Sequence, residues 1–176
     1  RHNLLLQTGK SQISHDLPGI DYKGNALSWE ITLQTGDWMP SSSNYLKIWP
    51  DANNHELIEQ DASGIFVEYK NSELRLVYSD TTGAETIITK HAVDFETGEK
   101  IHLKISGLPG NTWKMTSVGL SDKNISHSTG YFDIRSKQIT EQNHVFGIMF
   151  SHTKTRAGQI KFDDIKVKKI NMPPFL

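Results

Sequence analysis

Two aromatic side chains and one cation alternate along a short segment, Tyr45-Leu-Lys47-Ile-Trp49. In an extended chain, alternate side chains point to the same face. Tyr45, Lys47 and Trp49 would therefore share one face, opposite Leu46 and Ile48. Aromatic rings that stack on the apolar faces of sugar rings, beside a few polar groups, are the chemistry of carbohydrate recognition. The segment predicts a face that binds a polysaccharide or glycan.

Three further side chains of the same kinds, Phe66, Glu68 and Arg75, occupy the corresponding positions of two later segments. If the segments share a sheet, all six side chains form one aromatic and charged patch. The cations Lys47 and Arg75 would suit anionic sugars, because they pair well with carboxylate or sulfate. The alternative is that the N-terminal segment or a loop covers this face, which would make Trp49 part of a second core. The sequence leaves both interpretations open.

Two adjacent acids interrupt the last apolar segment at Asp163-Asp164. A regular strand cannot turn the apolar residues on both sides of this pair inward, since their parity changes across it. We therefore expect a β-bulge at Asp163-Asp164. Two carboxylates at a bulge suit either a loop cap or a structural calcium ion, and no other cofactor is predicted. The apolar residues that change parity are Ile160 and Phe162 before the pair and Ile165 and Val167 after it.

Catalytic motifs are missing from the sequence. It has no Gly-x-Ser-x-Gly nucleophile elbow, no His-Glu-x-x-His zinc motif and no glycine-rich phosphate loop. Glu68 and Glu73 lie on different predicted strands across a turn, so they do not supply the paired carboxylates of a retaining glycosidase. We predict that the chain is not an enzyme.

A polysaccharide lyase is a minor alternative. Ser72-Glu-Leu-Arg75 and Lys100-Ile-His102 resemble the arginine-bearing and histidine-bearing strands of alginate-lyase jelly rolls. Such an enzyme needs a cation to neutralise the substrate carboxylate and an acid and a base for proton transfer. The resemblance implies these roles for Arg75 and His102. Asn71 and Lys100 depart from the arginine and glutamine of that family.

Positioning these side chains requires many short strands. Apolar and polar residues alternate in residues 28–33, 45–49, 65–70, 74–79, 101–106 and 146–151, with turn-forming residues between them. Strands at this spacing predict an all-β, two-sheet antiparallel β-sandwich over residues 1–170. We expect residues 4–7 to form an edge strand. The predicted core contains Trp29, Ile31, Leu103, Trp113, Phe150 and Val167.

Composition excludes several classes of function. The 176 residues suit one domain, and 19 basic against 20 acidic side chains include no long basic run, so we predict no nucleic-acid partner. The absence of cysteine excludes a disulfide framework and a thiol nucleophile. No apolar stretch approaches the ~18 residues that span a bilayer. Because Pro173-Pro174 is linker-like, we expect residues 171–176 to lead to a following domain.

Five segments carry a resemblance: residues 27–33, Pro40-Ser-Ser-Ser-Asn-Tyr45, Gly110-Asn-Thr-Trp113-Lys-Met, residues 145–153 and residues 158–167. Taken in order, they resemble the concanavalin A-like sandwich modules of large secreted Bacteroidota proteins, which occur beside lamin-tail or immunoglobulin-like domains. The resemblance covers about residues 27–170. It implies a jelly roll, a secreted or cell-surface location in a bacterial envelope, and a non-catalytic role. We therefore expect a carbohydrate-binding-type module, or alternatively a structural or adhesive spacer that contacts neighbouring domains.

Overall fold

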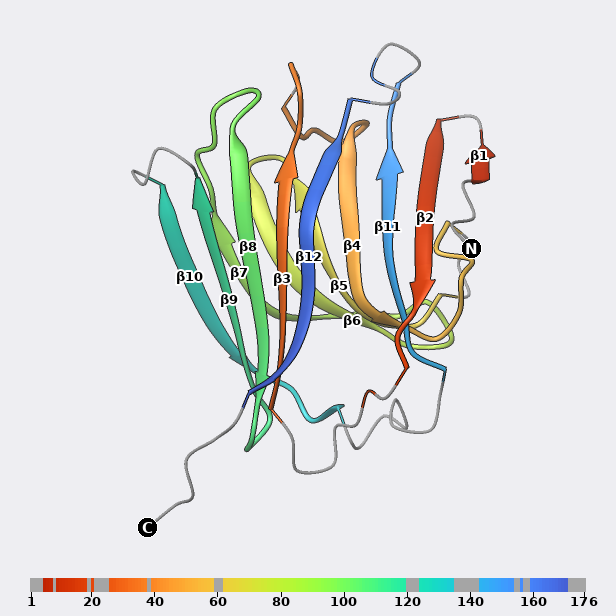
Figure 1. The fold of residues 1–176 in the computed structure, drawn as a ribbon, viewed down its shortest axis with the longest axis vertical. Helices are drawn as coiled ribbons and strands as arrows, with labels where there is room; N and C mark the ends of the chain where they lie inside the picture. Colours follow the sequence, from red (N-terminus) through yellow and green to blue (C-terminus); the bar gives the residue numbers. More distant parts are fainter. Residues whose placement is uncertain are drawn as a thin grey trace.

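Two antiparallel sheets lie face to face (Figure 1). The computed structural model describes residues 5–7, 9–18, 20, 26–37, 39–58, 62–119, 124–134, 143–153, 156 and 159–170. The predicted linker, residues 171–176, lies outside them. The strands are β1 (Leu5–Gln7), β2 (Lys10–Asp16), β3 (Ala26–Gln34), β4 (Tyr45–Ala52), β5 (Gly64–Lys70), β6 (Glu73–Ser79), β7 (Glu85–Ala92), β8 (Lys100–Leu108), β9 (Thr112–Gly119), β10 (Ile125–Tyr131), β11 (Val145–Ser151) and β12 (Lys161–Ile170).

The predicted fold class is confirmed. The seven-stranded sheet has the order β1-β2-β11-β4-β5-β6-β7, and the five-stranded sheet has the order β10-β9-β8-β3-β12. The residues of β1 form the expected edge strand. In the described part of the chain, no helix is long and apolar enough to cross a membrane.

The inner faces of the two sheets form one core, as the alternation predicted. Trp29 is fully buried and stacks on Trp113, with ring centroids 6.3 Å apart. The indole Nε1 of Trp113 donates a hydrogen bond to the carbonyl oxygen of Phe132 at 3.1 Å. Of the six predicted core residues, five are buried, and Val167 is partly buried against the others.

The expected β-bulge lies in β12. Asp163 pairs with Thr32 and Lys166 pairs with Glu30, so two residues of β12 stand opposite one residue of β3. The Asp163 carboxylate accepts the N–H of Asp164, whose φ is 51°. Ile165 is 45% exposed, so the expectation that it turns fully inward is wrong.

The two aspartates of the bulge have partners in the chain itself. The Lys166 ammonium lies 3.6 Å from Asp164, and Asp163 caps the bulge as described. Among the described residues, no group of three or more histidine or acidic side chains gathers around a common point. The loop-cap interpretation therefore has a structural basis, while the structural calcium ion stays a prediction.

A half-buried histidine ties the last strand of the larger sheet to the smaller sheet. The two ring nitrogens of His91 on β7 each lie 2.9 Å from a serine hydroxyl, that of Ser128 on β10 and that of Ser117 on β9. Burial lowers the pKa of His91, and His127 lowers it further. The unfolded chain therefore takes up this proton more readily than the folded chain.

We expect His91→Gln to weaken the acid sensitivity of the fold. The stability that neutral His91 contributes is present above the ordinary histidine pKa and is lost as the pH falls below it. His144 acts in the opposite sense, because its hydrogen bond to Asp51 raises its pKa. The variant is therefore compared with the unmodified chain by urea unfolding at about pH 7.5 and about pH 5.5. Equal losses of unfolding free energy in the two proteins would contradict the prediction.

Candidate functional site

The six side chains predicted to form a patch lie on the outer face of the seven-stranded sheet. Their strands β4, β5 and β6 are neighbours. The register places Lys47 beside Glu68, and Glu68 beside Arg75. The three strands therefore share a sheet, as the predicted patch requires. Alternation along each strand turns the six side chains to the same face.

Two of the predicted aromatic rings are buried rather than exposed. Trp49 is 3% exposed and Phe66 is 1% exposed, and their ring centroids lie 4.7 Å apart. The expectation that Trp49 is exposed is wrong, and the alternative of a second core is confirmed. In the described residues the cover comes from the loop after β4, the covering loop (residues 53–58 and 62–63). This second core comprises Trp49, Ala52, Leu57, Ala62, Phe66, Val77, Val145 and Met149.

Side chains of β2 hold the covering loop in place. The amide of Gln12 donates to the carbonyl oxygen of His55 at 3.0 Å and accepts the N–H of Ile58 at 2.9 Å. The hydroxyl of Ser14 lies 2.7 Å from Nδ1 of His55. Gln12 and Ser14 are buried although they are polar, because the loop satisfies them. The sequence shows the polar residues of this strand, but it does not show their partners.

Glu68 and Arg75 engage each other instead of projecting towards a ligand. Glu68 is 6% exposed and forms an ion pair with Arg75. Arg75 also lies 3.8 Å from Glu73, which in turn pairs with Lys90 at 3.2 Å. Neither Glu68 nor Arg75 lines the pocket described next. Their contact with a ligand stays a prediction. The contacts that the structure shows are ion pairs within the chain.

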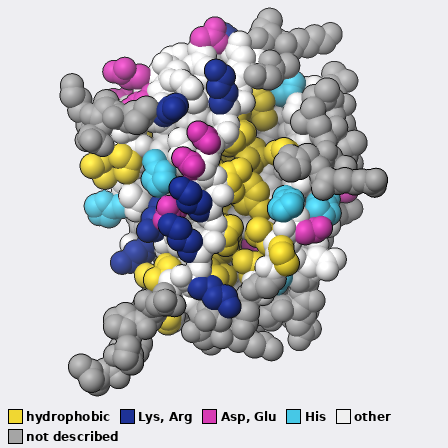
Figure 2. Space-filling model, in the orientation of Figure 1, with side chains coloured by type: hydrophobic (Ala, Val, Ile, Leu, Met, Phe, Trp, Pro, Cys, Tyr) yellow, Lys and Arg dark blue, Asp and Glu magenta, His cyan; other side chains and the backbone are white. Residues whose placement is uncertain are grey.

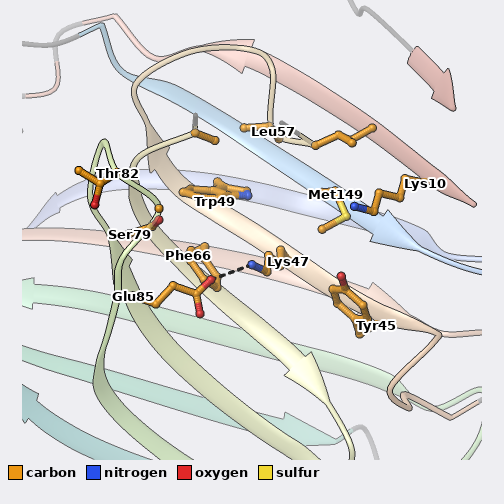
Figure 3. Close-up of a pocket in the computed structure, with 13 residues that line it drawn as sticks. Lys10, Tyr45, Lys47, Trp49, Leu57, Phe66, Ser79, Thr82, Glu85 and Met149 are labelled. Atoms are coloured by element: carbon orange, nitrogen blue, oxygen red, sulfur yellow. Dashed lines mark hydrogen bonds and ion pairs between the residues drawn. The ribbon is translucent and has the colours of Figure 1, made fainter. Parts of the chain in front are cut away.

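A pocket of about 400 Å³ opens beside the second core (Figure 3). Tyr45, Lys47 and Trp49 of β4 line it, together with Phe66 of β5 and Met149 of β11. The covering loop forms one wall and the turn between β6 and β7 forms another. The sequence therefore identified four of the lining residues, but it missed the residues of both walls, which are Leu57, Ile58, Ala62, Ser79, Thr82, Gly83 and Glu85, and Lys10 of β2.

The wall formed by the β6–β7 turn is organised by one carboxylate. Asp80 accepts the N–H of Thr82 at 2.8 Å, its hydroxyl at 2.7 Å and the N–H of Ala84 at 3.0 Å. Directly after the turn, Glu85 forms an ion pair with Lys47 at 3.1 Å. Figure 3 shows this pair at one side of the pocket. The Lys47 ammonium also lies 4.2 Å from the centroid of the Phe66 ring.

The buried indole of Trp49 leaves one polar atom without a partner. Its Nε1 has no hydrogen-bond acceptor among the described residues, although the atom is inaccessible to bulk water. In Figure 3 the nitrogen end of this ring is directed towards Met149 and Lys10. A buried donor without an acceptor costs about 1–3 kcal/mol, so such an atom beside a pocket calls for a ligand acceptor or a bound water.

The residues that suggested a lyase do not share a site. Arg75 lies on β6, on the outer face of the seven-stranded sheet. His102 lies on β8 of the other sheet, where its exposed side chain is opposite to its buried neighbours Ile101 and Leu103. The core of the sandwich separates the two. Arg75 and His102 therefore cannot act on one sugar residue.

No protein-family model matches this sequence, and no curated protein matches it. Solved structures do match. The carbohydrate recognition domain of Emp46p has a TM-score of 0.59 at 13% identity over 96% of this chain and 85% of that chain. The Lotus tetragonolobus seed lectin has a TM-score of 0.60 at 8% identity, over 98% and 93%. The HCR/D W1238A mutant has a TM-score of 0.60 at 13% identity, and the 97% of this chain that matches spans 43% of that one. At these identities the likeness shows the lectin-like β-sandwich fold.

Proposed function

We propose that this chain is a non-catalytic carbohydrate-binding-type module and that it holds sugar in the pocket between the covering loop and the β6–β7 turn. The observation that carries the proposal is the buried Trp49 Nε1–H, which lacks an acceptor in the described chain and belongs to a side chain that lines this pocket. Structures of the same fold include a carbohydrate recognition domain and a seed lectin, which supports the proposal.

The chemistry of the pocket suits a ligand rich in hydroxyl groups. Because the Trp49 nitrogen is closed off from bulk water, a sugar hydroxyl accepts from its N–H only when the pocket wall shifts on binding. The Lys47–Glu85 pair offers a donor and an acceptor side by side at 3.1 Å. Tyr45 is half-buried, and its ring lies under the Lys70 ammonium at 4.7 Å. Few contacts of this kind give affinities in the micromolar to millimolar range, or about 4–8 kcal/mol.

We expect Tyr45→Ala to weaken glycan binding about tenfold, because it removes one aromatic wall of the pocket. A glycan array identifies the ligand, and calorimetric titration then measures the affinity of each variant. Tyr131→Ala is the matched control, since Tyr131 is an exposed tyrosine on the opposite sheet. Equal losses in the two variants, or an array on which no glycan binds, would contradict the proposed site. The second outcome would favour the structural spacer.

The biological setting is part of the same proposal. We infer a secreted or cell-surface protein of a bacterial envelope, in which this module is joined to further domains. The support is the resemblance of the sequence to modules found beside lamin-tail domains. The order of domains in the full-length gene tests it, because a catalytic neighbour favours a sugar-targeting role and a run of repeated domains favours a spacer.

A further inference from the structure

Lysines gather on the outer face of the five-stranded sheet, although the whole chain has a net charge of −1. Figure 2 shows these side chains in dark blue over the front of the molecule. Three carboxylates lie among them, those of Glu30, Asp163 and Asp164. Within the described residues, this basic face therefore has an excess of three positive charges. Its lysines are Lys100, Lys104, Lys114, Lys161, Lys166 and Lys168.

Strand register arranges these charges in rows that cross the sheet. One row runs Lys166, Glu30, Lys104, Thr116 and His127, from β12 to β10. Adjacent strands are about 4.8 Å apart, so the lysines of this row stand roughly 10 Å apart. The parallel row contains Lys168, Ser28, Ser106, Lys114 and Thr129. Glu30 lies between the two lysines of the first row and two buried serines lie between those of the second, so the accessible hydroxyls are those of Thr116 and Thr129.

Glu30 does not neutralise its neighbours. Its carboxylate lies 3.5 Å from the ammonium groups of both Lys104 and Lys168. One negative charge is therefore shared between two positive charges, and a net positive charge remains. Burial raises the pKa of Glu30, but Lys168 and Lys104 together hold it below its ordinary value. Both ammonium groups remain about half exposed, and their surplus charge is available to a ligand.

One end of the basic face is recessed. A depression of about 320 Å³ lies over the ends of β3, β8 and β12, where the register aligns Lys161, Gln34 and Lys100. Its lining consists of these two lysines, the polar side chains of Gln34 and Thr32, the carboxylate of Asp163, and the apolar Leu33 and Phe162. The face therefore combines cations, accessible threonine hydroxyls and a concave end.

We propose that the basic face binds an acidic polysaccharide, a carboxylated or sulfated sugar chain lying across the strands. This site is separate from the pocket of the proposed function, which lies on the other sheet. Lysines attract the acidic groups of the polymer. The accessible hydroxyls of Thr116 and Thr129, beside the lysines, bind the sugar hydroxyls. Both components of the ligand thus have matching groups in the same rows.

The same features disfavour the other common polyanions. Proteins that bind single-stranded nucleic acid stack bases on aromatic rings. In the described strands of this sheet, the exposed aromatic side chain is Tyr131, at the end of the edge strand β10. A membrane surface needs apolar side chains that insert beside the cations. Ile125 is exposed on the same edge strand, away from the lysine rows, and Ile165, which is exposed on β12, lines a depression with Ile13 and Phe146 of the other sheet.

The test measures binding of the chain to heparin, polygalacturonate and neutral dextran at several salt concentrations. We expect the first two to bind, more weakly as salt rises, and dextran not to bind. Lys168→Gln should weaken binding roughly threefold, and the triple variant Lys104→Gln/Lys166→Gln/Lys168→Gln roughly thirtyfold, since each exposed ion pair contributes modestly. Lys90→Gln is the matched control, because Lys90 is a similarly exposed lysine on the other sheet. Thermal unfolding confirms that each variant folds.

Two results would overturn the proposal. One is a triple variant that binds heparin and polygalacturonate as tightly as the unmodified chain does. The other is tighter binding, with the same lysine dependence, to duplex DNA or to vesicles that contain phosphatidylserine. Trp49→Phe changes the pocket of the other sheet and should leave polyanion binding unchanged. Failure of the sugar pocket and failure of the basic face are therefore distinguishable.

Discussion

Trp49→Ala is expected to lower the free energy of unfolding by about 3–5 kcal/mol, whereas Trp49→Phe should lower it by less than about 2 kcal/mol. The alanine variant leaves a cavity in the second core, where Trp49 packs against Phe66 and Met149. The phenylalanine variant keeps most of the ring volume. It also removes a buried N–H that has no acceptor in the described chain, which offsets part of the loss.

The same two variants separate folding from binding. If the Trp49 N–H donates to a sugar, Trp49→Phe should weaken binding of the array-selected glycan about fivefold to tenfold, the effect of one neutral hydrogen bond. Trp113→Phe is the control, because the Nε1 of Trp113 donates to the carbonyl oxygen of Phe132 inside the main core. That variant should lose stability and keep its affinity. Unchanged affinity in Trp49→Phe would remove this N–H from the site.

Arg75→Leu is expected to lower the free energy of unfolding by about 2–3 kcal/mol. Removing one partner of a buried ion pair leaves the other charge uncompensated. Glu68 is 6% exposed, and the Arg75 guanidinium is its ion-pair partner. Because Arg75 itself is partly exposed to solvent, the expected loss lies below the value for a fully buried pair.

A double-mutant cycle isolates this interaction. Glu68→Gln/Arg75→Leu should recover most of the stability lost in Arg75→Leu, because the uncompensated carboxylate is then gone. Urea unfolding of the four proteins at neutral pH gives the coupling energy. Additive losses would show that the two charges do not interact appreciably. Glycan affinity, measured on the same proteins, tests whether either charge also contacts a ligand.

The local sequence pattern was sufficient to predict which way a side chain points wherever alternation along its own strand decides it. The alternation around Trp29 and Leu103 predicted the inner faces, and both residues are fully buried. The change of parity at Asp163-Asp164 predicted a bulge, which the register of β12 confirms. A period of two residues predicts these features because alternate side chains of a strand point to opposite faces of the sheet, one of which packs in the core.

Tertiary structure decided what covers the second face of the larger sheet. Tyr45, Lys47 and Trp49 share a face by alternation alone, but the loop that buries Trp49 depends on contacts between its residues and the side chains of Gln12 and Ser14. Such contacts join residues about 40 positions apart, and no local pattern records them.

The sequence by itself determined the sandwich, the inward and outward side chains of most strands and the bulge, since these follow from a period of two residues. It did not determine which outward side chains meet solvent, because that depends on which distant segments pack over them. Strand order decided the rest. It placed Arg75 and His102 on opposite sheets, paired Glu68 with Arg75, and aligned Lys104 with Lys166 across Glu30. Alternation specifies a face, but only the pairing of strands brings residues from distant parts of the chain together on it.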